Sequence, residues 1–597
     1  MRNLRHVDVI GFILIFLGIF LSPCSAQDRT VYDIGKNFEN LGKLRMDDPE
    51  HWKVVDGVLI LNAAKDDFAA KNATVDVGML DYQIDVNVVV GDSRLKDFAT
   101  TQNVHAGIIF RHDAKRAGVF YLAKPCNGWA ALATLEGTDR FRGKETFKGL
   151  SYDTRRGTHH LRAIVKGDWA NFYVDNELCC VMNVSGFSGT EVGLQTRMQA
   201  SITSFTVSKL PYGTRIYKQR PVTNLIADLG KGKICPGTKP WQQAMADTAK
   251  KIDKAVADGS PDVVGMEKMP NYVYRCVTYM PAGQVPFYAY PAFHHSIIMN
   301  GLLNYYDYSK DKKYFDLAIQ LADWELGHMT PADCYLPNMP YSTTMNGKMG
   351  GNVDGDTIML DKAGIMGTTY LRIYRLTNDK KYLDGAVGIA ETLLSVQKPE
   401  GRWQNRVRYD NGDATQDYTS NQIFNIVLMD GLYQITNDSR YDKSSKLAFK
   451  WLMDNPVKSW RWTGYYEDVA PGDESIGNWD AIETARYLIL HRNQNPAYLK
   501  IAHDISDWVA TAYCVRQDGL WPFTHEQSCC MVPMNCHTLH YAQLLNDLYK
   551  ATGDSYYRDA AISATNAGLS TDNEGWYSLT FTSPYIGLPL VRELNMK

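Results

Sequence analysis

Two histidine clusters could move protons to and from a bound substrate. His537 and His540 are three residues apart in SCCMVPMNCHTLHYAQLL, and Tyr541 follows directly; residues at this spacing fall near one face of a helix. His294 and His295 are adjacent in YAYPAFHHSIIMNGLL, so only one of them is expected to face a common pocket. Histidine exchanges a proton near neutral pH, and tyrosine does so beside a cation. We predict these five residues as catalytic; the alternative, for at least one of His537 and His540, is a core histidine bonded to a backbone carbonyl.

Two aspartates offer a second chemistry. Asp361 opens a helix predicted in GNVDGDTIMLDKAG, and Asp480 opens another in GNWDAIETARYL, directly after Trp479. A pair of carboxylates can supply the acid and the base of a hydrolytic reaction. The structural alternative is that both merely stabilise helix N-termini, where carboxylates are favoured. We include Asp361 and Asp480 among the predicted catalytic residues.

An arginine-rich segment could bind an acidic sugar. In GRWQNRVRYDNGDATQDYTSNQ, Arg402, Arg406 and Arg408 alternate with aromatic and polar residues. A strand-like loop would then present guanidinium groups on one side for bidentate binding of carboxylate or sulfate. The alternative is a solvated hairpin whose arginines pair with the aspartates of the same segment. The predicted substrate-binding residues are Arg402, Trp403, Arg406, Arg408, Tyr409, Tyr418, Trp479 and Asn535. Asn535 would polarise a carboxyl group or cap its helix.

A segment dense in cysteine and histidine could hold a metal. His525, Cys529, Cys530 and Cys536 precede His537, but their spacing is not that of a zinc finger. The loop over 354–361 contains three aspartates without the twelve-residue calcium pattern. Disulfides are the stronger expectation for the cysteines of an exported protein. We predict no cofactor, with a divalent Zn or Ca ion as the alternative.

An internal repeat predicts the elements that position these residues. Segments such as YLRIYRLTNDKKYLDGAVGIAETLL indicate a helix, a short polar turn and a second helix opened by a tyrosine, and the pattern recurs at intervals of about 60 residues. The repeated tyrosines are Tyr314, Tyr382, Tyr441, Tyr498 and Tyr557. Residues 241–597 are therefore predicted to form an all-α, (α/α)6-type toroid. Its sixth hairpin would combine the helix near Trp241 to Asp258 with an atypical partner.

Loop lengths predict one functional rim of this toroid. The turns within hairpins are short, such as Thr377 to Asp379. The connections between hairpins are long and occupy about residues 328–360, 397–419, 455–477 and 515–536. Long irregular loops are often functional. We expect the histidines, aspartates and arginines named above to meet at this rim, beside the positive ends of the inner helices.

The N-terminal third has a different period. Residues 28–209 alternate apolar and polar side chains, as in the run from Tyr82 to Val90, and contain many short predicted strands. This pattern predicts an all-β, two-sheet sandwich. Residues 210–240 are rich in proline and glycine and are predicted to be a linker.

Residues 1–26 have the features of an export signal. Two arginines precede an apolar run from Val9 to Leu21, and small residues lead to a cleavage point before Gln27. The run is too short to span a bilayer, and Pro23 disfavours a lipoprotein anchor at Cys24. We expect an exported protein, periplasmic or secreted, without a membrane span. A net charge of −3 lacks the cationic excess that nucleic-acid binding needs, so nucleic acid is not a predicted partner.

Both halves of the chain resemble known architectures. The segments GIIFRHDAKRAGVFYLA and LRAIVKGDWANFYVDNEL resemble the concanavalin-like or laminin-G-like sandwiches found beside bacterial sugar-degrading enzymes. The helical repeat resembles the (α/α) toroid enzymes of polysaccharide breakdown. These include polysaccharide lyases, oligosaccharide dehydratases, glycoside hydrolases, unsaturated-uronide hydrolases and sugar epimerases. No short motif matches one subfamily closely, so the resemblance implies a carbohydrate-active enzyme and assigns no catalytic residue.

Three functions are consistent with these residues. The first is β-elimination at a uronic acid of an acidic oligo- or polysaccharide, by a lyase or by a non-reducing-end dehydratase as in ulvan-like glycan breakdown. Elimination needs a base, a group that neutralises the carboxylate, and an acid for the leaving oxygen, and the histidines, Tyr541, Arg406 and Asn535 suit those roles. The second is glycoside hydrolysis by Asp361 and Asp480. The third is glycan binding without catalysis.

Overall fold

The computed structural model of the chain describes residues 29–62, 70–90, 104–113, 116–124, 129–136, 146–149, 157–197, 199–218, 239–258, 269–270, 272–273, 288–289, 291–342, 344–345, 348–349, 356–459, 462–463, 477–517, 520–526, 534–570 and 580–596. The predicted export signal with Cys24, most of the predicted linker, and Cys529 and Cys530 lie outside these residues. The predictions for them stay predictions.

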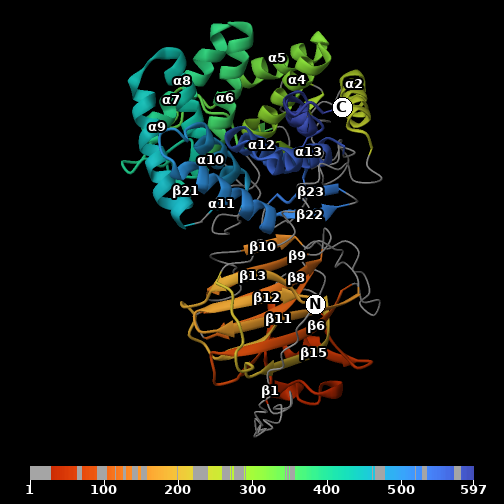
Figure 1. The fold of residues 1–597 in the computed structure, drawn as a ribbon. Helices are drawn as coiled ribbons and strands as arrows, with labels where there is room; N and C mark the ends of the chain where they lie inside the picture. The colour runs from red at the N-terminus through yellow and green to blue at the C-terminus, as the bar shows by residue number, and fades with distance from the viewer. Residues whose placement is uncertain are drawn as a thin grey trace, which may run out of the picture.

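An antiparallel β-sandwich forms the N-terminal part (Figure 1). Its strands are β1 Thr30–Asp33, β2 Arg45–Met46, β3 Trp52–Val55, β4 Val58–Asn62, β5 Ala70–Asp76, β6 Tyr82–Val90, β7 Val104–His112, β8 Arg116–Lys124, β9 Trp129–Glu136, β10 Thr146–Gly149, β11 Gly157–Lys166, β12 Trp169–Val174, β13 Glu177–Asn183, β14 Glu191–Arg197 and β15 Gln199–Ser208. One sheet has the order β13-β12-β11-β6-β15-β4-β3, with β1 also paired to β15. The other has the order β10-β9-β8-β7-β14-β5-β2.

The alternation in the sequence explains this sandwich. In β6, Tyr82, Ile84 and Val86 are fully buried in the core between the sheets, while the residues between them face outward. Asp175 and Asn176 both have positive φ, 46° and 70°, and form the tight turn between β12 and β13. The predicted all-β sandwich is confirmed.

The C-terminal part is built from helical hairpins. Its helices are α2 Trp241–Asp258, α4 Ser296–Ser309, α5 Lys312–Leu326, α6 Leu360–Thr377, α7 Lys380–Val396, α8 Gln422–Thr436, α9 Ser439–Leu452, α10 Trp479–Leu490, α11 Ala497–Ala512, α12 Asn535–Thr552, α13 Ser555–Leu569 and α14 Leu588–Glu593, with short turns of helix at η6 Pro291–His295, η8 Met453–Val457 and η10 Ser583–Gly587. The pairs α4/α5, α6/α7, α8/α9, α10/α11 and α12/α13 pack as hairpins. The first member of each pair belongs to an inner ring and the second to an outer ring, which confirms the predicted toroid.

Local sequence signals make these hairpins. Four inner helices end at a residue in the left-handed conformation, with φ between 56° and 73°; these residues are Lys310, Asn378, Asn437 and Gly553. An aspartate then caps the following outer helix; the capping residues are Asp311, Asp379, Asp438 and Asp554. The repeated tyrosines lie one turn further on. Tyr382 Oη, for example, donates to Asp323 Oδ1 of the preceding outer helix at 2.7 Å.

Both ends of the helical part complete the ring. Tyr314 Oη on α5 donates to Asp253 Oδ1 on α2 at 3.1 Å, which places α2 in the outer layer. The segment η10 to α14 takes the inner position between α12 and α4, and Asn304 Nδ2 on α4 donates to Tyr585 O at 3.0 Å. Figure 1 shows the C-terminus beside α2. The atypical partner of α2 is therefore the end of the chain.

Short strands lie at the rim where the inner helices begin. They are β16 Tyr288–Ala289, β17 Thr344–Met345, β18 Lys348–Met349, β19 Thr357–Met359, β20 Arg406–Arg408, β21 Ala414–Gln416, β22 Cys514–Gln517 and β23 Leu520–Thr524. Each lies in a connection that leads toward an inner helix, as the loop lengths predicted. None of the described helices combines the length and apolarity needed to cross a bilayer.

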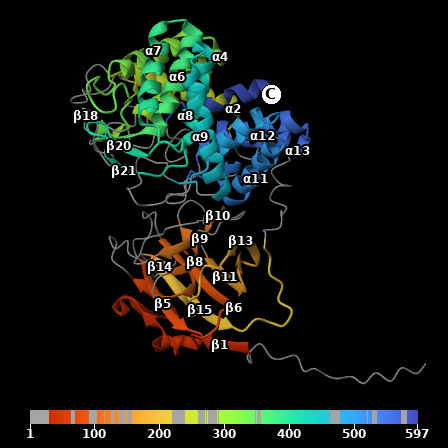
Figure 2. The ribbon, with the colours of Figure 1, turned by 90° about the vertical axis from the view of Figure 1, so that its left-hand side faces the viewer.

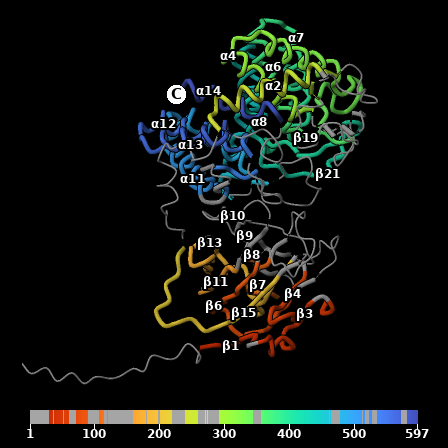
Figure 3. The backbone as a smooth tube through the Cα atoms, turned by 90° about the vertical axis from the view of Figure 1, so that its right-hand side faces the viewer, coloured from red at the N-terminus to blue at the C-terminus, as the bar shows by residue number. Residues whose placement is uncertain are grey.

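The sandwich packs directly on the helical part. Strand β10 contacts β22 (Figure 1) and α11 (Figures 2 and 3). Ile108 and Phe120 point into the core of the sandwich, whereas their neighbours Ile109 and Val119 belong to the apolar cluster that contains Val509 of α11. Strands β7 and β8 are therefore buried on both faces, and the second face joins the two parts of the molecule.

Candidate functional site

The N-terminal ends of five inner helices converge around Trp479. The Trp479 ring lies 5.2 Å from Phe293 before α4, 5.4 Å from Phe424 on α8, and 4.4 Å from His540 on α12. Lys362, the third residue of α6, places its Nζ 5.2 Å from the centre of the Phe293 ring. Because all of these helices begin at one rim, their positive ends surround a single cluster of buried polar groups.

Two buried carboxylates flank the start of α8. Asp361 Oδ2 lies 3.1 Å from Lys362 Nζ and accepts from Asn421 Nδ2 at 3.0 Å. Asp480 Oδ2 accepts a hydrogen bond from Ser420 Oγ. Burial raises the pKa of Asp480 to about 7, although the hydrogen bond from Ser420 and the charge of Lys362 act in the opposite direction. Two consecutive residues, Ser420 and Asn421, thus hold two carboxylates in unlike surroundings.

Three histidines are fixed through Nδ1. His295 Nδ1 is hydrogen-bonded to Glu325 of α5, and His540 Nδ1 to Glu483 Oε1 at 2.9 Å. A carboxylate only accepts, so Nδ1 carries the proton in both rings. His537 Nδ1 lies 2.9 Å from Asn478 Oδ1. Within the described part of the chain, Nε2 of each of these rings has no hydrogen-bond partner.

Two of the predicted histidines are held neutral. Burial, together with the neighbouring His295, lowers the pKa of His294 to about 3. Burial, together with His540 and Lys362, lowers the pKa of His537 to about 3. Neutral imidazoles of this kind are weak bases, because their conjugate acids lose the proton readily.

Tyr541 lies apart from this cluster. Its hydroxyl donates to Ser506 O of α11 at 3.3 Å, within an apolar cluster between the two rings. Burial raises the pKa of Tyr541 well above its usual value. Successive helical residues point about 100° apart, so a helix that turns His540 toward Trp479 turns Tyr541 toward the outer layer. The expectation that Tyr541 joins the histidines was wrong.

The arginine segment divides in two. Arg402 pairs with Glu400 at 2.9 Å and with Asp417 at 2.8 Å, and Arg408 pairs with Asp410 at 2.6 Å. These two follow the hairpin alternative. Arg406 is buried, and its Nη1 donates to Gln416 Oε1 at 3.0 Å. In the small sheet β19-β20-β21 it stands opposite Met359, which directly precedes α6.

The predicted aromatic contacts also divide. Trp403 is buried in the core, where its Nε1 donates to Leu393 O at 2.8 Å, so it cannot stack on a ligand as predicted. Tyr418 packs against Trp451 of α9 with ring centres 5.8 Å apart, and Tyr409 packs against Tyr341 at 5.7 Å. Trp479 is the aromatic residue that the fold places among the histidines. Asn535 is buried at the first position of α12.

The sequence analysis missed several residues of this cluster. Lys362 directly follows Asp361, and Ser420 and Asn421 directly precede α8, so the start of each inner helix was the available signal. Glu325 lies near the end of an outer helix. Its contact with His295 joins α5 to the segment before α4, and no local sequence pattern predicts this contact.

The described residues contain no group of three or more side chains arranged to hold a metal ion. Among them Cys334, Cys514 and Cys536 are free thiols. Burial raises the pKa of Cys514 to about 12. The remaining disulfide expectation stays a prediction.

Comparison with known proteins gives distant structural likenesses. No family model matches the sequence, and no curated protein matches it. Cellobiose 2-epimerase from Spirochaeta thermophila DSM 6192 is similar over 60% of this chain and 97% of its own, with 9% identity and a TM-score of 0.44. Unsaturated glucuronyl hydrolase from Streptococcus agalactiae is similar over 63% of this chain and 98% of its own, with 13% identity and a TM-score of 0.40.

A carbohydrate binding module is similar to a smaller part of the chain. The carbohydrate binding module CBM66 from Bacillus subtilis is similar over 30% of this chain and 98% of its own, with 12% identity and a TM-score of 0.21. At such identities and TM-scores these likenesses carry no argument about a reaction or a substrate. The chemistry must be inferred from the side chains at the rim.

Proposed function

We propose that the protein is a carbohydrate-processing enzyme that hydrolyses a glycosidic bond in an acidic oligo- or polysaccharide. The observation that carries the proposal is the pair of buried carboxylates held by Ser420 and Asn421. Asp480 has a pKa of about 7 and Asp361 is ion-paired with Lys362. Two carboxyl groups with unlike environments can divide the roles of acid and base.

Each residue then has a role. Asp480 donates a proton to the leaving glycosidic oxygen, and Asp361 activates water or attacks the sugar, depending on the distance that separates the two groups. Trp479 offers an aromatic face to a sugar ring. Lys362 and Arg406, both buried at the start of α6 or beside it, supply the positive charge that a uronate or sulfate needs.

β-Elimination is the second candidate. It is favoured by His295 and His540, whose Nδ1 atoms are bonded to glutamates and whose Nε2 atoms have no partner among the described residues. Either Nε2 could accept the C5 proton of a uronate whose carboxylate contacts Lys362 or Arg406. The candidate ranks second because Tyr541 lies elsewhere and His294 and His537 are weak bases. The lyase and dehydratase outcomes both belong to it.

A glycan panel separates these functions. The purified protein is incubated with neutral, uronate-containing and sulfated oligosaccharides, and new reducing ends and near-ultraviolet absorbance are followed together. Hydrolysis predicts reducing ends without an absorbance gain, whereas elimination predicts an absorbance gain from an unsaturated uronate. A panel without any reaction, but with glycan binding, would favour the non-catalytic alternative.

The export of the protein also remains a proposal. It is supported by the composition of residues 1–26 and by the polymeric nature of the proposed substrate. Fractionation of cells that produce the full chain, with N-terminal sequencing of the product, tests it. A mature product that starts at Gln27 is expected.

A further inference from the structure

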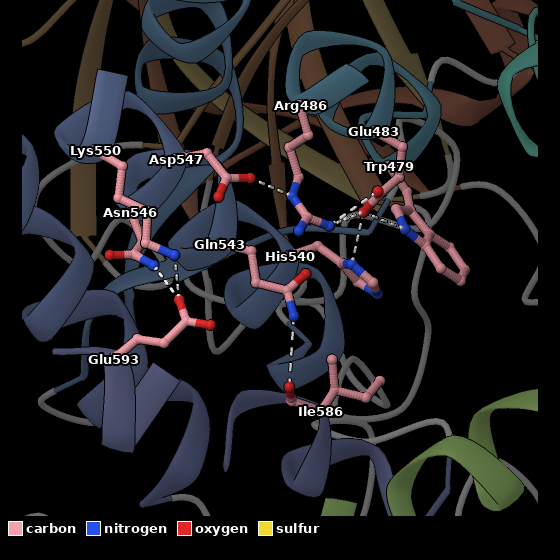
Figure 4. A network of polar contacts seen from close by, with 10 residues as sticks. All are labelled: Trp479, Glu483, Arg486, His540, Gln543, Asn546, Asp547, Lys550, Ile586 and Glu593. Carbon is pink, nitrogen blue, oxygen red and sulfur yellow. Dashed lines mark hydrogen bonds and ion pairs between the residues drawn. The ribbon is translucent and has the colours of Figure 1, made fainter. Parts of the chain in front are cut away.

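A network of polar and charged side chains extends from the candidate site along the inner helices α10 and α12 (Figure 4). Glu483 Oε1 accepts from His540 at 2.9 Å and from Trp479 Nε1 at 3.3 Å. Both Glu483 oxygens also contact Arg486 Nη1, at 3.2 and 3.0 Å. Arg486 Nε donates to Asp547 Oδ2 at 2.8 Å. One carboxylate therefore fixes two residues of the rim and is itself fixed from the other side.

The helix period places these residues in two facing stripes. Trp479, Glu483 and Arg486 lie four and then three residues apart on α10, and His540 and Asp547 lie seven apart on α12. Glu483, Arg486 and Asp547 all line a cavity of about 510 Å³, whose other lining residues lie mostly on α10 and α12, with Val427 on α8. Arg492, Lys550 and Ala551 line the part of this cavity that lies toward the short turns, whereas Glu483 on its other side is hydrogen-bonded to His540 of the candidate site.

The charges of Glu483 and its neighbours hold this group of residues in place. Burial opposes the ionisation of Glu483, but Arg486 and His540 outweigh it and lower the pKa of that carboxyl to about 2. An ionised carboxylate between a guanidinium and an imidazole accepts charge-assisted hydrogen bonds from both. Side chains on two helices, α10 and α12, therefore hold His540 in one rotamer.

We propose that Glu483, Arg486 and Asp547 are positioning residues that hold His540 in the Nδ1-protonated tautomer and hold Trp479 against the substrate. The inference rests on the proposed function for its catalytic consequence. Its structural content, the tautomer of His540, is independent of which glycan is bound. His540 Nε2, which is buried without a hydrogen-bond partner among the described residues, is the ring atom left to contact a bound sugar.

The first test needs no substrate. The full chain is labelled with ¹⁵N-histidine, and the ring signals of His540 are assigned by their loss in His540→Gln. Wild type is expected to show Nδ1 protonated and Nε2 unprotonated. Glu483→Gln keeps an acceptor oxygen and should keep this tautomer, whereas Glu483→Leu should lose it. A wild-type ring protonated only at Nε2, or a Glu483→Leu spectrum identical to wild type, would overturn the proposal.

The second test measures kinetics with the substrate found in the glycan panel. Displacement of a positioned group lowers turnover by up to about 100-fold, so Glu483→Leu is expected to lower kcat by this order. Glu483→Gln should recover part of the loss, and Asp547→Asn at the distant end should cause a smaller one. Lys550→Met is the matched control, because Lys550 borders the same cavity but pairs with Glu593. It should leave kcat unchanged.

The two tests fail separately. If no glycan reacts but the tautomer behaves as expected, the positioning role stands and the proposed function falls. A second outcome is that Glu483→Leu lowers kcat while Asp547→Asn and Lys550→Met both keep the kcat of wild type. Asp547 would then have no positioning role, and that part of the proposal would be overturned. Thermal unfolding of each variant shows whether it is folded during the assay.

Discussion

At the scale of single residues, the proposed reaction depends on two carboxylates, those of Asp361 and Asp480, that lie in different environments. Asp361 and Asp480 both open inner helices, as the sequence predicted, and both are buried. What the sequence could not show is that Ser420 and Asn421 hold these two carboxylates. Those contacts join helices far apart in the chain, so their energies depend on the packed ring and not on any local pattern.

Replacement of the proposed acid should abolish most of the activity. Asp480→Asn keeps the shape of the side chain but cannot donate the proton, so kcat should fall by about 100- to 10,000-fold. Steady-state kinetics on the reactive glycan measures the loss. Tyr541→Phe is the control: Tyr541 lies between the rings, and its kcat should stay within about twofold of wild type while stability falls by about 1 kcal/mol.

The same aspartate should make stability depend on pH. The pKa of Asp480 is raised to about 7 in the folded protein, so the folded state binds more protons than the unfolded state between its ordinary pKa and about 7. Stability therefore falls as pH rises through this window, by up to roughly 1.4 kcal/mol for each pH unit.

Asp480→Asn removes this titration, so the variant should gain stability relative to wild type at pH 8 and lose that advantage at pH 4. Denaturant unfolding at both pH values measures the difference. Equal differences at the two pH values would show that Asp480 does not titrate in this window.

At the scale of elements, the hairpins follow from local signals, and the close approach of α6 and α8 does not. Aspartate caps and left-handed turn residues stand next to each other in the sequence, so the repeat was predictable. By contrast, the contact of Gly364 on α6 with Asn425 on α8 requires the absence of a side chain, which acquires meaning only in the folded ring.

Gly364→Ala should therefore disturb the site through α8. An added Cβ would lie 2.3 Å from Asn425 Oδ1 and 2.8 Å from Asn425 N, so α8 must shift. We expect a loss of about 1–3 kcal/mol in the free energy of unfolding, together with lower kcat, because Ser420 and Asn421 precede α8. Gly327→Ala, whose Cβ would meet no atom closer than 3.5 Å, should have neither effect.

At the scale of the whole molecule, the sandwich and the toroid share an apolar interface. The sequence predicted both architectures, but it could not show that β7 and β8 are buried on two faces, because a strand pattern alone does not reveal what covers its outer side. The sandwich contacts α11 and β22, and β22 leads to β23 and then to α12, which carries two of the site histidines.

Disruption of this interface should uncouple the two parts. Val119→Asp buries an unpaired charge between them, so calorimetry of the variant should resolve two unfolding transitions where wild type shows one. Val54→Asp, at an exposed position of the sandwich, is the control and should unfold as wild type does. Two transitions already present in wild type would show that the interface does not couple the domains.

The most direct measurement of the central claim is a crystal structure of Asp480→Asn with an acidic oligosaccharide from the reactive panel. The account predicts a sugar against Trp479, with the scissile oxygen within about 3 Å of the side chain at position 480 and Asp361 facing the anomeric carbon. An oligosaccharide bound only on the sandwich, or at the rim with both positions remote from the glycosidic bond, would contradict it.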